Sequence, residues 1–259
     1  MASAIIGGLI RQGMSAEHLM VVEPFAESAA KLTRDFGITP LPAAGPELAN
    51  AQLVVWAVKP QIFAEAAAPV MPHTSGALHL SVAAGIRTDS ICRWVATPRV
   101  VRSMPNTPAL VGKGVTGLYA CPAVTLADKA LVEDVIGTTG QFLWVDTETK
   151  LDAVTALSGS GPAYVFYFLE AMTEAGVGMG LSAKQAYLLA VATFSGASSL
   201  AAASAESPEV LRQRVTSKGG TTYAAISAME AAGIKDAFIQ AMYAAELRAR
   251  ELGDEFGKS

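Results

Sequence analysis

The spacing of hydrophobic residues divides the chain into two parts. Up to about residue 146, short apolar runs rich in β-branched residues alternate with segments of helical periodicity. Because these runs are apolar on both faces, they are typical of strands in a mainly parallel sheet that helices cover on both sides. The predicted strands lie at 18–23, 52–58, 77–84, 99–104, 114–120 and 141–146, and the predicted helices at 1–10, 26–37, 61–70 and 125–137.

Beyond Asp146 the strand pattern stops and helical periodicity continues toward the C-terminus. Ser182 is a suitable N-cap, and Pro208 is suited to the start of a helix. The predicted helices lie at 150–159, 163–180, 182–200, 207–217, 221–233 and 234–253. We therefore predict an α/β domain over residues 1–146 and an all-helical domain over residues 147–259.

The composition favours a large core or a buried subunit interface, because 51% of the residues are hydrophobic and 16% are charged. A formal net charge of -4, with no basic run, argues against a nucleic-acid partner. Cys92 and Cys121 lie outside any CxxC spacing, so we predict neither a disulfide framework nor a metal site, and a cytoplasmic location. Serine and glycine interrupt the apolar segment 186–203, which favours a helix packed against protein over one in a membrane.

Three loops follow predicted strands of the first part, and open α/β sheets bind ligands at such strand ends. Lys59-Pro60 ends the first loop, where a lysine can meet a phosphate or can simply be solvated. The second loop contains Ala83 and Ala84, which leave room for a flat ring. In the third, Pro105 and Pro108 stiffen the chain around Asn106, although a rigid turn without a ligand has the same composition.

The helical part contains two stretches that break its periodicity. The glycines of "SGSGPAY" (158–164) are compatible with a turn between helices or with the close approach of another backbone. The stretch "SKGGTT" (217–222) leads directly into a helix that begins at Thr221 or Thr222. Free amides at a helix N-terminus can bind a small carboxylate, and threonine is also a routine N-cap without any ligand.

Five motifs taken together resemble the pyrroline-5-carboxylate reductase family. They occur in the family's order and cover nearly the whole chain: "WAVKPQ", "SVAAGI", "RSMPNTPALVGKG", "SGSGPAYVFYFLEAM" and "VTSKGGTTYAAI". The resemblance implies a Rossmann-type domain followed by an all-α dimerisation domain, a homodimer and in several members a decamer. It also implies reduction of 1-pyrroline-5-carboxylate to L-proline, the last step of proline biosynthesis, with a hydride from NADPH or NADH.

The resemblance further implies a set of site residues. Thr222 is the catalytic candidate, with its hydroxyl beside the ring nitrogen of the substrate. The implied substrate-binding residues are Ser217, Lys218, Gly219, Gly220, Thr221 and Thr222, and the backbone of the last three would hold the carboxylate. The implied cofactor-binding residues are Ala57, Val58, Lys59, Pro60, Ala83, Ala84 and Asn106.

The start of the chain differs from the family pattern. Members begin with a strand and a glycine-rich turn of the form G-x-G-N-M-A, and "MASAIIGGLI" resembles only the helix that follows it. The first strand of the Rossmann-type sheet and most of the pyrophosphate anchoring are therefore missing from this sequence. We expect the natural protein to start earlier, with Met1 an internal methionine.

The end of the first predicted strand leaves the cofactor preference open, and the two-domain plan leaves two other functions open. Glu23 stands where an acid usually bonds the ribose 2′-OH of NAD and repels the phosphate of NADP, so the cofactor preference is open. Another imine or 3-hydroxyacid reductase would have the same two-domain plan, but "SKGGTT" argues against it. A non-catalytic helical dimer is the alternative from outside the enzymes.

Overall fold

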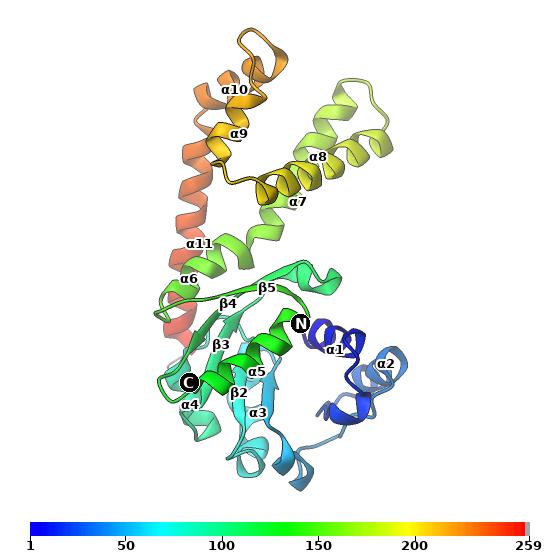
Figure 1. Ribbon diagram of the computed structural model, residues 1–259, viewed down its shortest axis with the longest axis vertical. Helices are drawn as coiled ribbons and strands as arrows, with labels where there is room; N and C mark the ends of the chain where they lie inside the picture. Colours follow the sequence, from blue (N-terminus) through cyan, green and yellow to red (C-terminus); the bar gives the residue numbers. More distant parts are fainter. Residues whose placement is uncertain (257–259) are drawn as a thin grey trace. The chain divides into compact units, whose positions relative to one another are not determined.

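A single five-stranded sheet organises the first part of the chain, in the order β1-β2-β3-β4-β5 (Figure 1). The computed structural model describes residues 1–256. All neighbouring strands are parallel except β3 and β4, so the predicted mainly parallel sheet is confirmed. The strands are β1 (Leu53–Trp56), β2 (Leu78–Ser81), β3 (Val100–Met104), β4 (Gly114–Ala120) and β5 (Gly140–Trp144).

Helices cover both faces of this sheet and bury its two rows of side chains. On one face, Leu80 of β2 and Val101 of β3 pack in a cluster with α1 and α5. On the other face, Val100 of β3 packs in a cluster with α3 and α4. The helices of this part are α1 (Ala2–Arg11), α2 (Ala26–Phe36), α3 (Phe63–Val70), α4 (Thr88–Val95) and α5 (Leu126–Gly137). Short 3₁₀ turns connect them at η1 (Ala16–His18), η2 (Pro46–Asn50), η3 (Pro60–Ile62), η4 (Met71–His73) and η5 (Thr107–Val111).

The strand predicted at 18–23 is wrong. Val22 pairs with Leu41 in one isolated parallel bridge that is not part of the sheet. Two hydrogen bonds accompany it, from the amide of Glu23 to the carbonyl of Leu41 and from the amide of Leu41 to the carbonyl of Val21. This run pairs with none of the strands β1 to β5, and a single bridge is too short a ladder to make it a strand.

Helix α4 was not evident in the sequence pattern. Its N-cap is Arg87, which makes no side-chain cap hydrogen bond, so the local signal for a helix start is missing. The cap comes instead from the distant Glu148, as described below.

Helices make up the second part, as predicted. Ser182 caps α8 in a capping box with Gln185, and Pro208 occupies the first turn of α9, so both predicted helix starts are confirmed. The helices are α6 (Lys150–Val154), α7 (Gly161–Gly178), α8 (Ala183–Ala203), α9 (Pro208–Arg214), α10 (Thr221–Ala231) and α11 (Ile234–Phe256).

The glycine-rich stretch 158–164 does not separate two helices by a loop. A π-helical turn, η6 (Thr155–Gly159), joins α6 to α7, and the amide of Ser160 donates to the carbonyl of Thr155 over 2.9 Å. Gly159 lies against the side chain of Met104, since a Cβ there would lie 2.4 Å from Cε of Met104 and that side chain would have to shift. The stretch is therefore part of a continuous helical connection whose close neighbour is a side chain, and the close approach of another backbone stays a prediction.

Within residues 1–256, α8 is the one helix long and apolar enough to cross a membrane by length and composition. Its mean hydropathy is 1.5, and 11% of the tested window is buried inside this chain. Helices in the core of a protein meet the same two criteria.

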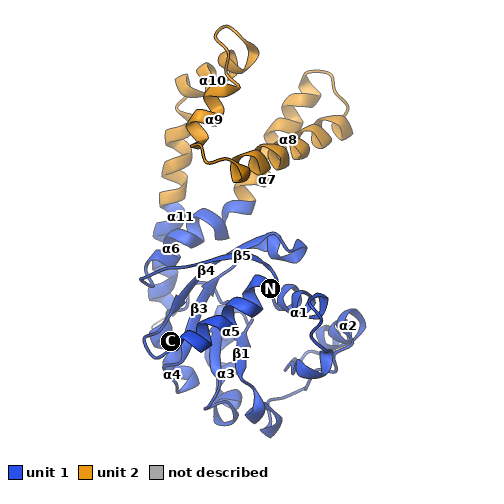
Figure 2. Ribbon diagram, viewed as in Figure 1, with its two compact units in different colours: residues 1–162, 244–259 blue, residues 163–243 orange. Residues whose placement is uncertain are grey.

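The chain forms two compact units (Figure 2). One unit contains residues 1–162 together with the C-terminal residues from Ala244 onward, and the other contains residues 163–243. The last strand, β5, ends at Trp144, close to the domain boundary expected between residues 146 and 147. That boundary stays a prediction.

Candidate functional site

Three loops at the carboxyl ends of β1, β2 and β3 carry the residues expected to bind a cofactor. Because these three strands are mutually parallel, their ends lie along one edge of the sheet. Ala57, Lys59 and Ala84 are exposed, whereas Ala83 is buried. Val58 and Pro60 are partly buried, and Asn106 is 9% exposed.

A buried histidine fixes the end of β1. Nδ1 of His79 accepts a hydrogen bond from Nε1 of Trp56 over 3.0 Å, and its Nε2 lies 3.3 Å from the carbonyl oxygen of Thr74. These partners require the neutral ring with its proton on Nε2. Burial lowers the pKa of His79 from its usual 6.5, which maintains that state. The residue after Trp56 is Ala57, so the loop after β1 begins from a rigid point.

Serine hydroxyls shape the loop after β2. Oγ of Ser81 accepts from the amide of Ala83 over 3.2 Å, and Oγ of Ser103 donates to the carbonyl of Ser81 over 2.7 Å. Gly85 has φ of +75°, and a Cβ there would be 3.1 Å from the ring of Phe256. The backbone at Ala83 and Ala84 is therefore held in place with only methyl groups projecting from it.

Both polar atoms of the Asn106 side chain make hydrogen bonds. Its Oδ1 accepts from the amide of Val115 over 3.0 Å, and its Nδ2 donates to the carbonyl of Ser158 over 3.2 Å. These bonds join the loop after β3 to the start of β4 and to the π-helical turn η6. The structure thus gives Asn106 an anchoring part in this loop, and its contact with a cofactor stays a prediction.

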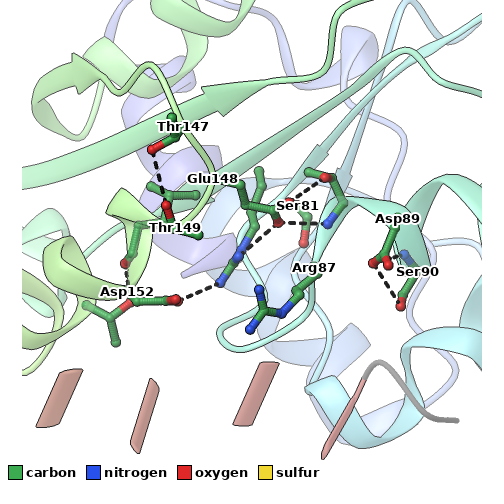
Figure 3. A network of polar contacts seen from close by, with 12 residues as sticks. Ser81, Arg87, Asp89, Ser90, Thr147, Glu148, Thr149 and Asp152 are labelled. Carbon is green, nitrogen blue, oxygen red and sulfur yellow. Dashed lines mark hydrogen bonds and ion pairs between the residues drawn. The ribbon is translucent and has the colours of Figure 1, made fainter. Parts of the chain in front are cut away.

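A charged network next to these loops was missed by the sequence analysis. Glu148, on the segment before α6, contacts Thr88 of α4 and Arg102 of β3, and Asp152, within α6, pairs with Arg102. Figure 3 shows the two acids. Burial raises the pKa of Asp152 above its usual 3.8. An arginine in the middle of the apolar run 99–104 was the available signal, because a buried charge requires a partner.

The expected substrate residues gather at the start of α10. The amide of Gly220 donates to the carbonyl of Ser217 over 3.0 Å, and Gly219 has φ of +76°, so the segment forms a tight turn. Ser217, Lys218 and Gly219 are exposed. Within the described chain Lys218 has no acidic partner, so its charge is available at this turn.

Gly220 is the N-cap of α10 and makes no side-chain cap hydrogen bond. The interpretation of Thr221 or Thr222 as an N-cap is therefore wrong, because both lie inside the helix. The amides of the first turn have no acceptor from the preceding turn of the helix. Thr221 is exposed and Thr222 partly buried. Free amides, the positive end of an eleven-residue helix and the Thr222 hydroxyl can together bind a small carboxylate and direct a proton.

Glu23 and the two cysteines have local partners in the structure. Oε1 of Glu23 accepts from the amide of Phe25 over 2.9 Å, which uses one of the two carboxylate oxygens in a local turn. Over residues 1–256, no group of three or more histidine, cysteine, aspartate or glutamate side chains is arranged to hold a metal ion. The thiols of Cys92 and Cys121 are free, with their sulfur atoms 4.0 Å apart.

Comparisons with known proteins agree with this architecture. The family model described as pyrroline-5-carboxylate reductase dimerisation matches residues 148–252. The model described as NADP oxidoreductase coenzyme F420-dependent matches residues 1–85.

Individual relatives extend over the whole chain. The pyrroline-5-carboxylate reductase of Pseudomonas aeruginosa is 42% identical, and the alignment covers 100% of this chain and 95% of the relative. A solved structure of the Coxiella burnetii enzyme is 36% identical with a TM-score of 0.90, covering 97% of this chain and 94% of that one. The Plasmodium falciparum pyrroline carboxylate reductase, solved with NADP bound, is 28% identical with a TM-score of 0.85, covering 97% and 94%. With this identity over its full length and the same two-part fold, the chain belongs to the pyrroline-5-carboxylate reductase family.

Proposed function

We propose that this chain reduces 1-pyrroline-5-carboxylate to L-proline with a hydride from NADPH or NADH, the last step of proline biosynthesis. The observation that carries the proposal is the uncapped N-terminus of α10, with the Thr222 hydroxyl in its first turn. The reaction itself is the one named for the reductase family, to which this chain belongs, and the start of α10 suits that reaction.

The first turn of α10 would hold the substrate carboxylate. The backbone amides of Thr221 and Thr222, together with the helix dipole, favour a negative group at this point, and the amide of Gly220 fixes the turn beside them by donating to the carbonyl of Ser217. Ser217, Gly219 and the cation of Lys218 complete the turn around it. Since the ring nitrogen of the substrate lies next to the carbon that bears the carboxylate, a group bound here places that nitrogen within reach of the Thr222 hydroxyl.

The Thr222 hydroxyl would assist the proton that the ring nitrogen must carry. An imine accepts a hydride far better when it is protonated, and a positioned proton donor contributes roughly 10²–10⁴-fold to the rate. A threonine hydroxyl both donates and accepts, so it can pass a proton without becoming charged.

The loops after β1 and β2 fit the expected cofactor. Ala57 and Ala84 are exposed and carry only methyl groups, so a flat ring can approach the backbone, and Lys59 has no acidic partner within residues 1–256 that would compete with a phosphate. Ala57, Val58, Lys59 and Pro60 would line one side of the cofactor, with Ala83, Ala84 and Asn106 toward the nicotinamide. When bound, NAD(P)H supplies the hydride that adds to the C=N carbon.

We propose a homodimer built on the helical part, further assembly to a decamer, and a cytoplasmic location. Several large apolar side chains of residues 163–243 are exposed in the single chain, including Tyr167 at 69%, Leu188 at 66% and Leu200 at 71%. Apolar patches of this kind mark protein interfaces, and the family model for this part is one of dimerisation. The functional domains would be residues 1–146 for the cofactor and 147–259 for substrate and dimerisation.

Replacement of Thr222 by alanine tests the proposal. We expect Thr222→Ala to lower kcat for pyrroline carboxylate by about 10²–10⁴-fold, with the affinity for NADPH nearly unchanged. The measurements are the loss of NADPH absorbance during turnover and a fluorescence titration of the cofactor. Thr33→Ala, which removes an exposed threonine hydroxyl from α2, is the matched control. Wild-type turnover in Thr222→Ala would show that this hydroxyl takes no part in the reaction.

A further inference from the structure

Glu148 makes an unusual set of contacts for a residue in a connecting segment. It lies between β5 and α6, and its side chain is 20% exposed. Its Oε1 accepts from the amide of Thr88 over 2.8 Å and from Nη1 of Arg102 over 2.9 Å. Its Oε2 accepts from the hydroxyl of Thr88 over 2.7 Å. Both carboxylate oxygens are thus engaged, by two elements that are distant in sequence (Figure 3).

The contact with Thr88 caps helix α4 from outside. Arg87, the N-cap residue, provides no side-chain acceptor of its own, and Thr88 is the first residue of the helix. A carboxylate that accepts from a first-turn amide satisfies a free donor and interacts favourably with the helix dipole. The start of α4 therefore depends on an acid 60 residues away.

The start of α4 is also the end of the loop that carries Ala83 and Ala84. At the other end of this loop, Oγ of Ser81 holds the amide of Ala83 over 3.2 Å. Between these anchors, Gly85 has φ of +75°, and the chain turns sharply. Glu148 thus supplies one of the anchors for the segment expected to face the nicotinamide.

The contact with Arg102 ties the same carboxylate to β3. The Arg102 side chain is 4% exposed, so its charge must be paired within the protein. Besides Glu148, its acidic partner is Asp152, with Nη2 and Oδ1 3.9 Å apart. Arg102 lies two residues before Met104, where β3 ends and the loop with Asn106 begins. One carboxylate therefore connects the supports of two cofactor loops.

We propose that Glu148 is a positioning residue for hydride transfer: through Thr88 and Arg102 it fixes the loops after β2 and β3 that face the nicotinamide. This inference rests on the proposed function, since the reaction being positioned is the reduction described above. Glu148 acts through its two partners and makes no contact with the reacting atoms. A misplacement of about 1 Å in such supports can cost roughly 10²-fold in rate.

The test uses Glu148→Gln and Glu148→Ala in the full chain. Glutamine keeps the size and one acceptor oxygen but loses the charge, whereas alanine removes every contact. We expect kcat per folded site to fall by about 10-fold for glutamine and about 10²-fold for alanine, with KM for pyrroline carboxylate within about twofold of the wild type. Asp146→Ala is the matched control, because it removes an exposed ion pair with Lys150 from the same segment and should leave kcat unchanged.

Hydrogen exchange provides a second readout that needs no cofactor. Glu148→Gln should speed exchange of the Thr88 amide and of the loop before it, while amides of α5 keep wild-type protection. Unchanged exchange at Thr88, or wild-type kcat in Glu148→Ala, would overturn the inference, as would an equal loss of kcat in Asp146→Ala. A wild-type chain that bound NADPH without reducing pyrroline carboxylate would refute the proposed function instead, and exchange at Thr88 would still decide whether Glu148 anchors this loop.

Discussion

His79 offers a direct test of how burial sets the electrostatics beneath the loops after β1 and β2. Its side chain is fully buried, with Nδ1 accepting from Trp56 and Nε2 next to the carbonyl of Thr74. Protonation of Nδ1 would remove the acceptor for Trp56 and place a charge in an apolar layer. We therefore predict that His79→Asn, which cannot titrate, changes both the stability of the protein and its dependence on pH.

The expected loss of stability in His79→Asn follows from the contacts of the histidine ring. Asparagine can still accept from Trp56 but is too short to reach the carbonyl of Thr74, and it leaves part of the ring volume empty. The lost hydrogen bond and the cavity together should lower the free energy of unfolding by about 2–4 kcal/mol at pH 7.5.

The sign of the pH dependence follows from the lowered pKa. Because burial lowers the pKa of His79 in the folded state, the unfolded chain binds the proton more readily. The stability due to the neutral ring is therefore fully present above pH 6.5 and is lost as the pH falls below 6.5, by at most about 1.4 kcal/mol per pH unit. His79→Asn should lack this contribution, so the gap between the two proteins should narrow toward pH 5.5.

The assay is urea denaturation at several pH values between 5.5 and 8, at one salt concentration and one protein concentration. His18→Asn, at an exposed position, is the control and should follow the wild-type curve. Nitrogen NMR of the ring should find Nδ1 of His79 without a proton throughout. Parallel stability curves for wild type and His79→Asn across this range would refute the reasoning, because they would mean that His79 binds its proton equally well folded and unfolded.

Two further predictions concern a thiol and a backbone position. Burial raises the pKa of Cys92 from 9.0 to about 12, so alkylation by iodoacetamide at pH 8 should be roughly 10³-fold slower than for a cysteine in a short peptide, and a rate equal to that of the peptide would contradict this. Gly140→Ala should lower the free energy of unfolding by about 2 kcal/mol or more in urea denaturation, because φ is +141° and a Cβ would lie 2.1 Å from the carbonyl oxygen of Gly114. Gly137→Ala, with 3.8 Å to its nearest neighbour, is the control, and equal stabilities of the two variants would show that the backbone adapts without cost.

Much of the fold followed from local patterns in the sequence. The five runs that became β1 to β5 are apolar on both faces, and that property is visible without knowing their partners. Ser182 and Pro208 marked helix starts because capping depends on neighbouring residues. The parallel order of the first strands then placed Lys59, Ala84 and the loop of Asn106 along one edge, as expected of open α/β sheets.

Other features depended on residues that are far apart in sequence. The apolar run 18–23 has strand composition, yet it forms one bridge, because a strand needs a partner along its length. Helix α4 carries no local cap, since Glu148 provides it. The carbonyl of Ser158 became a partner for Asn106 only where the π-helical turn meets the loop after β3.

The difference between the features that local sequence predicts and those that it does not has one physical cause. Periodicity and capping reflect interactions between residues a few positions apart, so the sequence determined the order and type of most elements and the position where α10 begins, while the structure showed which residue is its N-cap. Pairing of a buried charge or of a lone strand depends on which distant groups the fold brings within hydrogen-bond distance. Tertiary structure alone therefore decided that Arg102 would meet Glu148, and that the same carboxylate would cap α4.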